Sequence, residues 1–352
     1  MAELDLIAAL SARQGALGRA ATVYGVTSSA GWTLGLDLGS TQVHAHARGL
    51  NGQRIFESTV TLARQDVDDK VAAIRTLMSR VRRAVGDTNG PLYTVGIALP
   101  RIVSDYLETG VSDSHGTPDI GSLIHSVGAD PGIPILIENN VNCAALAEMD
   151  GGIAQRTDDF GYLQIGVGIG AGIVAGGRVL RGAHGGAGEL SAIPNGWPAR
   201  HGQDPFELER YLGSDGLLRR CSSAWTDESV PAPRTVPELF SLAGQGHATA
   251  MQVIDQHAAD IGQLALTLVA VTDPDLIVLG GGVGRNPALT EGVREVVRRV
   301  QPRIRVEASE LGDTATVAGA AALALDHALS GLLGRHHERR LDIRVSHVVN
   351  TD

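Results

Sequence analysis

The sequence predicts an α/β protein with two lobes and a cleft between them, in which the second lobe repeats the plan of the first. The chain has 352 residues, which is long for one small core and suits two α/β lobes. Short apolar strands alternate with amphipathic helices along the chain. A strand that ends in a glycine turn and continues into a hairpin occurs at residues 32–50 and again at 162–180. This recurrence indicates an internal duplication.

The first half begins with a strand at residues 32–39 (WTLGLDLG), which ends in a glycine turn. Two further strands are expected at 43–50 and 54–60, where apolar and polar residues alternate. From Asp66 onward apolar residues recur at helical spacing, which predicts a helix that is capped by Asp66 and ends at Gly86. The other elements expected in this half are strands at 93–99 and 134–138 and a helix at 142–149.

The second half begins in the same way, with a strand at residues 162–172 (YLQIGVGIGAG) and a return strand at 173–180. The proline-containing stretch 224–235 is expected to be a surface loop. The charged tail from residue 335 is expected to be mobile or to add an edge strand. Further elements expected here are a strand at 275–282 and helices at 252–271, 289–300 and 316–329.

The two glycine turns, one at the start of each half, can each offer backbone N–H groups to a phosphate chain. Glycine turns are also common in proteins that bind no phosphate, so either turn alone would not favour one interpretation. Because the turns open two similar halves, the pattern favours phosphate binding.

The composition excludes several classes of protein. Apolar residues make up 43% of the chain, the mean hydropathy is +0.05, and no apolar run reaches the ~18 residues that a membrane span needs. Residues 1–10 contain acids and lack the basic start of a signal peptide, so we expect a cytoplasmic protein. Cys143 and Cys221 are too few for a disulfide framework. The net charge of −10 argues against a nucleic-acid surface over the whole molecule, although a small basic module could be present.

Five motifs follow one another along the chain: DLGSTQ at 37–42, ENNVNCAALAE at 138–148, GVGIGAGIV at 166–174, RGAHGGAGEL at 181–190 and LIVLGGGVG at 276–284. In this order they resemble the ROK family, which groups bacterial sugar kinases with sugar-responsive transcriptional repressors. The resemblance covers residues 31 to 329. It implies the duplicated actin-like ATPase (ribonuclease H-like) fold, with two lobes around a central cleft, and a homodimer.

The resemblance also implies a division of the chain into segments. Residues 1–31 resemble the remnant of a winged helix-turn-helix and its linker, and residues 331–352 form a tail. The smaller N-terminal lobe is expected at 32–140, with the helix at 316–330 packing back onto it, and the larger C-terminal lobe at 141–315.

Several residues match the nucleotide site of the ROK kinases. Asp37 resembles the carboxylate that holds the magnesium shell, and Gly39 and Thr41 would offer an N–H group and a hydroxyl to a phosphate. Gln42 stands where the kinases usually have lysine or another polar residue, which removes a potential cation. The turn that approaches the adenosine matches three consecutive glycines, Gly280, Gly281 and Gly282. These glycines could also serve only to preserve the fold.

The second phosphate turn is altered in this chain. Kinases usually have Gly-Thr-Gly there, whereas this chain has Gly166, Val167 and Gly168. Losing a hydrogen bond to a charged phosphate weakens binding by roughly 1.5–3 kcal/mol, which is about one to two decades in affinity. The resemblance therefore implies that no cofactor is required, although residual Mg-ATP binding is compatible with the remaining residues.

The catalytic position of the resemblance is occupied by an amide. In ROK kinases the motif reads Glu-Asn-Asp, and the aspartate accepts the proton of the attacking sugar hydroxyl. Here Glu138 and Asn139 are followed by Asn140. An amide can hydrogen-bond a hydroxyl but cannot take up its proton near neutral pH, and losing a positioned base typically costs about 10²- to 10⁴-fold in rate.

The zinc motif of the family is also absent from the sequence. The zinc-binding histidine is replaced by Ala192, and no cysteine occurs between Ala192 and Arg210. A structural zinc needs four nitrogen or sulfur ligands, and His184 and His201 alone cannot supply them. We therefore expect no zinc and no other metal, with a loop held by proline and packing.

The residues that would bind a sugar are largely retained. Asn139 matches the family's asparagine beside the base, Glu189 the glutamate of its Gly-Glu-Ile motif, and Glu209 the glutamate that closes the zinc loop. Together with Asn140 they form the expected sugar site. In the competing interpretation Glu189 caps a helix and Glu209 is a solvated helix residue.

The segment before the first strand resembles the repressors more than the kinases. Residues 4–13 are predicted to form one helix, and residues 18–32 resemble the wing strand and linker of the repressors. Arg13 and Arg19 are the only basic residues of this segment, so we expect weak DNA binding unless a full helix-turn-helix lies upstream.

Three functions remain open on the sequence. A sugar sensor of the repressor type, without kinase activity, is favoured by Asn140, Val167 and the missing zinc ligands. An ATP-dependent hexose kinase is the alternative, supported by Asp37 and the glycine turns. A scaffold that binds neither sugar nor nucleotide would show no thermal shift with any sugar.

Overall fold

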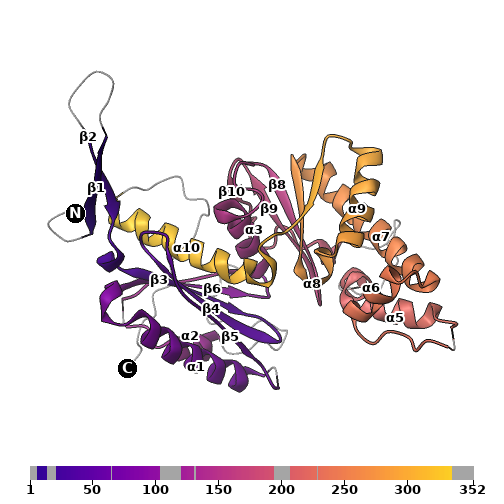
Figure 1. Ribbon diagram of the computed structural model, residues 1–352, viewed down its shortest axis with the longest axis horizontal. Coiled ribbons are helices and arrows are strands. Elements are labelled where there is room, and N and C mark those ends of the chain that lie inside the picture. Colours follow the sequence, from indigo (N-terminus) through magenta and orange to yellow (C-terminus); the bar gives the residue numbers. More distant parts are fainter. Residues whose placement is uncertain are drawn as a thin grey trace. The chain divides into compact units, whose positions relative to one another are not determined.

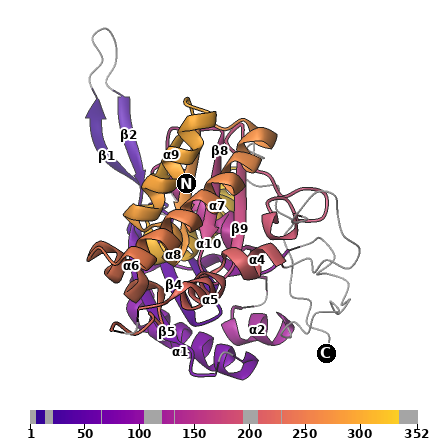
Figure 2. The ribbon, with the colours of Figure 1, turned by 90° about the vertical axis from the view of Figure 1, so that its right-hand side faces the viewer.

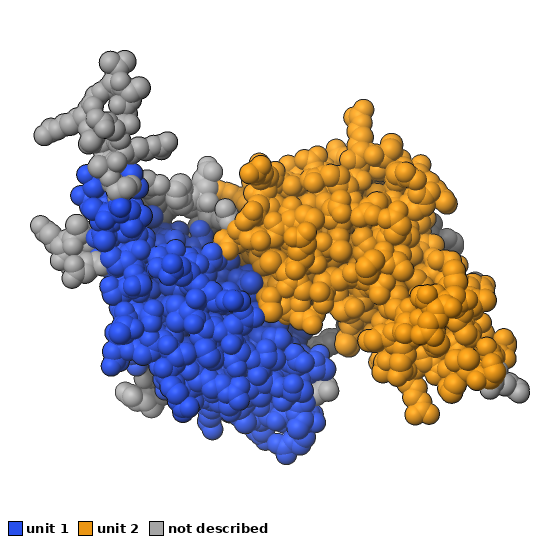
Figure 3. All heavy atoms as spheres, viewed as in Figure 1, with its two compact units in different colours: residues 1–143, 316–352 blue, residues 144–315 orange. Residues whose placement is uncertain are grey.

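The computed structural model describes residues 6–13, 21–64, 66–103, 120–130, 132–193, 207–227 and 229–334. The chain forms two compact units: unit 1 comprises Met1–Cys143 with Thr316–Asp352, and unit 2 comprises Ala144–Ala315 (Figure 3). Each unit has its own sheet and its own hydrophobic core. The chain enters unit 2 within helix α3 (Asn140–Gly151) and leaves it at the start of helix α10 (Ala315–Leu332). The tail from residue 335 lies outside the described residues.

Unit 1 is built on a five-stranded sheet with the strand order β5-β4-β3-β6-β7 (Figure 1). The strand β3 (Trp32–Leu38) pairs antiparallel with β4 (Gln42–Gly49) and parallel with β6 (Leu92–Leu99). The edges are β5 (Arg54–Thr61) and β7 (Ile135–Asn139). These strands confirm the five that the sequence predicts for this half.

Helices cover both faces of this sheet. The helix α1 (Val67–Val85) buries Ile74, Leu77 and Val81, in a core shared with alternate residues of β3. The side chain of Asp66 caps this helix, as predicted, by accepting a hydrogen bond from the Asp69 amide at 2.8 Å. The short helix α2 (Ile120–Val127) packs beside α1.

Helix α10 covers the opposite face and approaches the strands closely. A Cβ atom on Gly35 would lie 2.4 Å from the Ala321 amide nitrogen, and one on Gly96 would lie 2.2 Å from the Ala320 carbonyl oxygen. Only glycine therefore fits at these two positions. Among the described residues, 312–332 is the one helical stretch whose length and hydropathy (1.3) would suit a membrane span. Half of that stretch is buried in the fold, and its packing on β3 and β6 accounts for its apolar character.

Unit 2 repeats the topology of unit 1. Its sheet has the order β10-β9-β8-β11-β12, in which β8 pairs antiparallel with β9 and parallel with β11. The duplication predicted from the two glycine-ended strands is thus confirmed. The strands are β8 (Phe160–Ile165), β9 (Ile169–Ala175), β10 (Arg178–Val179), β11 (Leu276–Gly280) and β12 (Arg305–Ala308).

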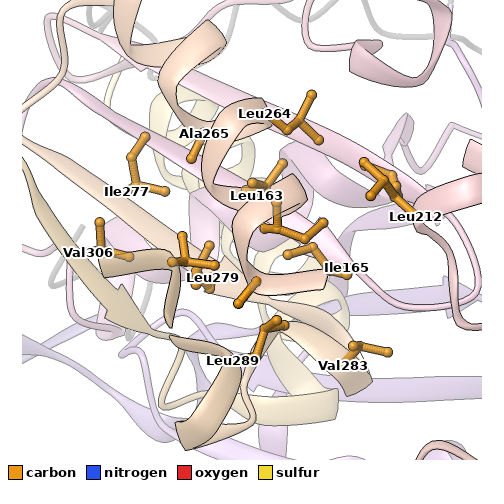
Figure 4. Close-up of a cluster of buried hydrophobic side chains, with 14 of the residues drawn as sticks. Leu163, Ile165, Leu212, Leu264, Ala265, Ile277, Leu279, Val283, Leu289 and Val306 are labelled. Atoms are coloured by element: carbon orange, nitrogen blue, oxygen red, sulfur yellow. The ribbon is translucent and has the colours of Figure 1, made fainter. Parts of the chain in front are cut away.

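The core of unit 2 lies between this sheet and two long helices. Helices α7 (Ala248–Thr272) and α9 (Pro287–Val300) run side by side in Figures 1 and 2, and Figure 4 shows their apolar side chains meeting those of β8 and β11. The remaining helices are α4 (Glu207–Leu212), α5 (Ser214–Ala224), α6 (Val236–Gly244) and α8 (Gly281–Gly284), with 3₁₀ turns at Ser28–Ala30, Asp87–Asn89, Leu190–Ala192 and Gly312–Thr314.

The prediction of a helix at residues 4–13 is wrong. Residues Ile7–Arg13 form strand β1, which pairs antiparallel with β2 (Ala21–Val26). Alanine and leucine in β1 favour a helix locally, but the cross-strand partners Val23, Tyr24 and Val26 have strong strand propensity. Pairing with β2 therefore overrides the local preference of β1. The surface loop expected at 224–235 is confirmed between α5 and α6 over the residues that the structure describes.

Candidate functional site

The Glu138–Asn140 motif lies where β7 ends and α3 begins, in unit 1. Asn139 is buried, and its Oδ1 accepts hydrogen bonds from the amides of Val141 (2.7 Å) and Asn142 (3.3 Å). Its Nδ2 donates to the Arg101 carbonyl at 2.9 Å. Asn139 is thus the N-cap of α3. Asn139, which we expected to bind sugar, therefore also stabilises the start of α3.

Glu138 is also part of this helix start. The carboxylate is buried, and its Oε1 accepts hydrogen bonds from the Asn139 amide at 2.7 Å and from Asn142 Nδ2 at 3.0 Å. These bonds fix the strand-to-helix turn and so fix the backbone of Asn140, the first residue of α3. The side chain of Asn140 is half-buried, and none of the hydrogen bonds seen between described residues involves it. Within the part of the chain that the structure describes, no hydrogen bond competes with a polar ligand for this amide.

Asp37 lies near the end of β3, in the same unit. Its side chain is 9% exposed, and burial raises the pKa of this carboxyl to about 7, although the charge of Lys70 opposes the shift. Lys70 is the only lysine in the chain, and burial lowers its pKa. A role for Lys70 beside Asp37 could not be predicted from the sequence, because the helical spacing of α1 gives no sign of a functional residue there.

The turn after β3 contains the other two residues expected to meet phosphate. Gly39 is half-exposed, and a Cβ atom there would lie 2.8 Å from the Gln42 carbonyl oxygen, so the turn itself requires glycine. Thr41 is exposed at the start of the hairpin. Its hydroxyl is accessible to a ligand.

In unit 2 the corresponding turn, residues 166–168, is occupied by a carboxylate of the protein. The Ile169 amide donates a hydrogen bond to Glu209, which comes from α4. A Cβ atom on Gly168 would lie 2.5 Å from Glu209 Oε1, so Gly168 leaves room for this carboxylate. Val167, at the tip, is 70% exposed and presents methyl groups to solvent. The turn thus already holds an anion.

The three consecutive glycines at 280–282 lie beside this turn. The reason for having glycine differs from one position to the next. A Cβ atom on Gly280 would lie 1.9 Å from the Tyr162 hydroxyl, and Gly281 has a positive φ of 78°. These two glycines are explained by the fold of unit 2. A Cβ atom on Gly282 would have no neighbour within 4 Å, and one on Gly166 would have only the Gly282 amide nitrogen, at 3.8 Å. The backbone is therefore open to a ligand at Gly166 and Gly282, which lie next to each other.

A buried polar network, which was not predicted from the sequence, supports the glycine segment. Glu148 and Tyr162 are almost fully buried, and Ser309 Oγ donates to Glu148 Oε1 at 2.5 Å. Tyr162 also hydrogen-bonds Ser309, and its hydroxyl oxygen accepts from the Gly281 amide. Burial raises the pKa of Glu148 and of Tyr162. The network connects α3 with the glycine segment. Two of its members, Glu148 and Ser309, are 161 positions apart in the sequence.

The two glutamates expected to bind sugar lie near each other in unit 2. Burial raises the pKa of both, and the charge of Glu209 raises that of Glu189 further. Glu189 occupies the N-cap position of the 3₁₀ turn Leu190–Ala192, but its side chain makes no capping bond. Two half-buried carboxylates in proximity are suitable acceptors for sugar hydroxyls.

The residues do not fit the zinc site that the resemblance implies. Among the described residues no group of three or more His, Cys, Asp or Glu side chains could hold a metal ion. Ala192 carries no donor, and His201 lies outside the described residues. His184 is exposed.

The structure groups the expected site residues by unit. Unit 1 holds Asp37, Gly39, Thr41, Asn139 and Asn140, each at the carboxyl end of a strand or in the turn that follows. Unit 2 holds the two glutamates and both glycine segments, namely Glu189, Glu209, Gly166, Gly168, Gly280, Gly281 and Gly282. Within unit 2 the two glycine segments are brought together, and Glu209 joins them.

Two duplicated sheets with glycine turns after their first strands define a protein of the actin-like ATPase class. The model of the ROK family matches residues 33–327, and the chain belongs to this family. It is 25% identical to the xylose repressor of Caldicellulosiruptor bescii, over 89% of this chain and 83% of the repressor. A bifunctional enzyme NanE/NanK of Brucella suis is 28% identical over 83% of this chain, which spans 53% of that enzyme.

Solved structures give the same assignment. A ROK family glucokinase from Streptomyces griseus, in complex with glucose and AMPPNP, is 25% identical with a TM-score of 0.62, and 84% of this chain and 99% of that chain are covered. A ROK family transcriptional regulator, a homologue of the Escherichia coli MLC protein, has a TM-score of 0.74 at 22% identity, with 93% and 86% covered. The relatives thus include both sugar kinases and repressors.

Proposed function

We propose that this chain is a sugar-binding sensor of the repressor type, a transcriptional regulator without sugar-kinase activity. The observation that carries the proposal is Asn140, which occupies the position of the proton-accepting aspartate of the ROK kinases. Its carboxamide can donate to and accept from a sugar hydroxyl. It cannot remove a proton from that hydroxyl, so binding is retained while phosphoryl transfer is lost.

The start of α3 supports a binding role for Asn140. The neighbouring side chains, Glu138 and Asn139, are held by hydrogen bonds that fix the strand-to-helix turn. The half-buried amide of Asn140 therefore stands on a rigid backbone, which is what a recognition residue requires.

The turn of unit 2 supports the loss of the kinase reaction. The exposed methyl groups of Val167 replace a hydroxyl that would hydrogen-bond a nucleotide phosphate. The carboxylate of Glu209 already accepts the hydrogen bond of the Ile169 amide. A phosphate at the turn would compete with this carboxylate and would meet a charge of its own sign.

The extent of the similarity also favours a regulator. The regulator structure covers 93% of this chain, and the glucokinase covers 84%. Residues 18–32 are the segment that we expected to resemble a repressor linker. Its described part ahead of β3, residues 21–31, contains β2 and a 3₁₀ turn.

The proposal is tested by comparing the wild-type chain with Asn140→Asp. Coupled ADP release is measured with D-glucose, D-xylose and N-acetyl-D-glucosamine, and binding of each sugar is measured by thermal shift. We expect binding of at least one sugar, no turnover in the wild type, and turnover about 10²-fold or more above background in Asn140→Asp. A sugar at about 100 times its dissociation constant adds about 2.7 kcal/mol of stability. Rapid turnover by the wild type contradicts the proposal.

A sugar kinase is the second candidate, and one observation favours it. The backbone at Gly166 and Gly282 is open, as a nucleotide site would require, and Asp37 is retained. In that case Asn140→Asp should change the rate little, because another group would act as the base. A scaffold that binds neither ligand would show no thermal shift with any of the three sugars.

The remaining parts of the proposal concern ligands and partners. We propose that a sugar or sugar derivative is the ligand, that neither zinc nor another metal is required, and that residual Mg-ATP binding is weak. The chain acts as a cytoplasmic homodimer in this proposal. DNA binding requires a complete helix-turn-helix in addition to the hairpin β1–β2, because the described residues of that hairpin include a single basic residue, Arg13.

A further inference from the structure

Helix α4 carries Glu209 but has only six residues, Glu207–Leu212. A helix of this length is not stable by itself, so contacts with other elements must hold it. The resemblance implies a zinc ion for this task, and the described residues offer no metal-binding group. The side chains around the end of α4 show what holds this helix.

Two adjacent arginines of α5 hold the C-terminal end of α4. Arg220 Nη1 donates to the Tyr211 carbonyl oxygen at 2.6 Å, and Arg219 Nη2 donates to the Arg210 carbonyl oxygen at 2.7 Å. The Gly213 amide donates to the Glu209 carbonyl oxygen at 2.8 Å. The last carbonyl groups of a helix lack partners within the helix, and cations are favourable there.

Arg220 is itself fixed in three directions. Its guanidinium carbon lies 3.9 Å from the centre of the Tyr211 ring, and its Nη2 lies 2.9 Å from His257 Nδ1. The hydroxyl of Tyr211 donates to Asp260 Oδ2 at 2.9 Å. Helix α7, which carries His257 and Asp260, therefore anchors the tyrosine and the arginine together.

His257 is suited to this role because it is fully buried. Burial lowers the pKa of His257 to about 3, so its imidazole is neutral. An arginine only donates, and hence Nδ1 must be the acceptor and Nε2 must carry the proton. Nε2 has no hydrogen-bond partner among the described residues. The fold tolerates this unsatisfied N–H group while the imidazole holds Arg220.

We propose that Arg220 is a positioning residue of the sugar site, which holds α4 where a metal would and so places the Glu209 carboxylate at the 166–168 turn. The inference rests on the proposed function for its sugar-binding consequence. The carboxylate lies close to the turn, because Glu209 Oε1 is 2.5 Å from the place where a Cβ atom of Gly168 would be. A small shift of α4 would break the bond from the Ile169 amide to Glu209.

The test uses the full chain with Arg220→Met, which keeps an apolar stem of similar length and removes the cation. Hydrogen exchange at the Ile169 amide reports whether Glu209 is in place. Calorimetry measures the dissociation constant for D-glucose and so reports the state of the sugar site. We expect the Ile169 amide to exchange at least about tenfold faster and the D-glucose dissociation constant to rise about tenfold. The matched control is Arg298→Met on α9, where Arg298 pairs with Glu295 on the surface, and both readouts should stay at wild-type values there.

A double-mutant cycle separates positioning from general support of the fold. In a Glu209→Gln background, Arg220→Met should weaken D-glucose binding less than twofold further, because Arg220 acts through the carboxylate. An equal loss in both backgrounds overturns the proposal, as does wild-type exchange at Ile169 in Arg220→Met. If Arg220→Met does not fold, His257→Leu and His257→Gln take its place. The side-chain oxygen of glutamine can accept a hydrogen bond from Arg220, and leucine cannot. The Ile169 amide should therefore exchange more slowly in His257→Gln than in His257→Leu. Equal exchange rates in the two variants overturn the proposal.

The exchange measurement requires no ligand. A wild-type chain that does not bind D-glucose would count against the proposed function only. The effect of Arg220 on the Ile169 amide would still decide whether the arginine holds Glu209.

Discussion

The hairpins β3–β4 of unit 1 and β8–β9 of unit 2 have the same backbone plan and different contents. Aligned on the turn glycines Gly39 and Gly166, Asp37 of β3 corresponds to Gln164 of β8, and Gly35 corresponds to Tyr162. In unit 1 the backbone of α10 lies against Gly35, whereas in unit 2 the hydroxyl of Tyr162 joins the network with Ser309 and the Gly281 amide. The comparison teaches that duplication preserved the strand order while packing and charge diverged.

The turns themselves differ in the same way. In unit 1 a buried carboxylate, Asp37, lies just before the turn, and Thr41 is exposed. In unit 2 the carboxylate of Glu209 comes from another helix and accepts a hydrogen bond directly after the turn, and Val167 is exposed at the tip. The turn of unit 1 thus follows a carboxylate of its own strand and exposes a hydroxyl, whereas the turn of unit 2 has a carboxylate from another helix beside it and exposes methyl groups.

The largest effect is expected where the helix backbone touches the sheet of unit 1. Gly35→Ala would place a Cβ atom 2.4 Å from the Ala321 amide nitrogen, and a helix backbone cannot move aside without displacing α10. We expect a loss of about 3–4 kcal/mol in the free energy of unfolding, measured with urea. Gly161→Ala in β8 is the control, because the nearest atoms to its Cβ would be side-chain atoms of Leu268 and Ile277 rather than backbone, and about 1 kcal/mol is expected. Equal losses would show that the units tolerate overpacking alike.

The second effect concerns pH, which should act on the two units with opposite signs. The folded pKa of Asp37, about 7, exceeds the unfolded value, so its contribution is full below about pH 4 and is lost as the pH rises through 7. The folded pKa of His257, about 3, is below the unfolded value, so its contribution is full above about pH 6.5 and is lost as the pH falls toward 3. Each slope is at most about 1.4 kcal/mol per pH unit.

Asp37→Asn should therefore stabilise unit 1 by about 2–3 kcal/mol at pH 8, without magnesium or nucleotide, and should leave the acid slope of unit 2 unchanged. His257→Gln should flatten that acid slope and leave unit 1 unchanged. Hydrogen exchange with mass spectrometry at several pH values resolves the two units. An unchanged alkaline slope in Asp37→Asn would show that the buried carboxylate is not its source.

The smallest effect concerns the tip of the turn in unit 2. Val167→Thr restores the hydroxyl that Thr41 presents in unit 1, and we expect the affinity for AMPPNP to rise about tenfold, which is about 1.4 kcal/mol. Calorimetry measures the change. Val271→Thr on α7, another exposed valine, is the matched control. No gain in affinity would indicate that Glu209, rather than the missing hydroxyl, limits nucleotide binding.

Much of the fold could be predicted because its signals are local. The alternation in β4, the Asp66 cap and the glycine after β3 each concern residues close in sequence. The strand β1 is the exception, since pairing with Val23 and Tyr24 decided its conformation. Local propensity cannot anticipate a partner that lies beyond its own window.

The candidate site was predictable in its residue types and not in its contacts. The motifs identified Asn140, Glu189 and Glu209, because the resemblance is carried by short strings. The bond from the Ile169 amide to Glu209, 40 positions away, and the contact of Arg220 with His257, 37 positions away, depend on how helices pack. The task of Asn139 as a helix cap could have been read from its place before Asn140 and Val141.

The position of α10 at the end of the chain has a consequence for synthesis. The face of the first sheet that contains Gly35 and Gly96 has no cover until the ribosome has added residues 315–332. At about 5–20 residues per second, the interval between Cys143 and Thr316 lasts roughly 10–35 s. During that time the sheet of unit 2 and its helices can fold as an uninterrupted stretch, while the sheet β5-β4-β3-β6-β7 still lacks the helix that covers one of its faces.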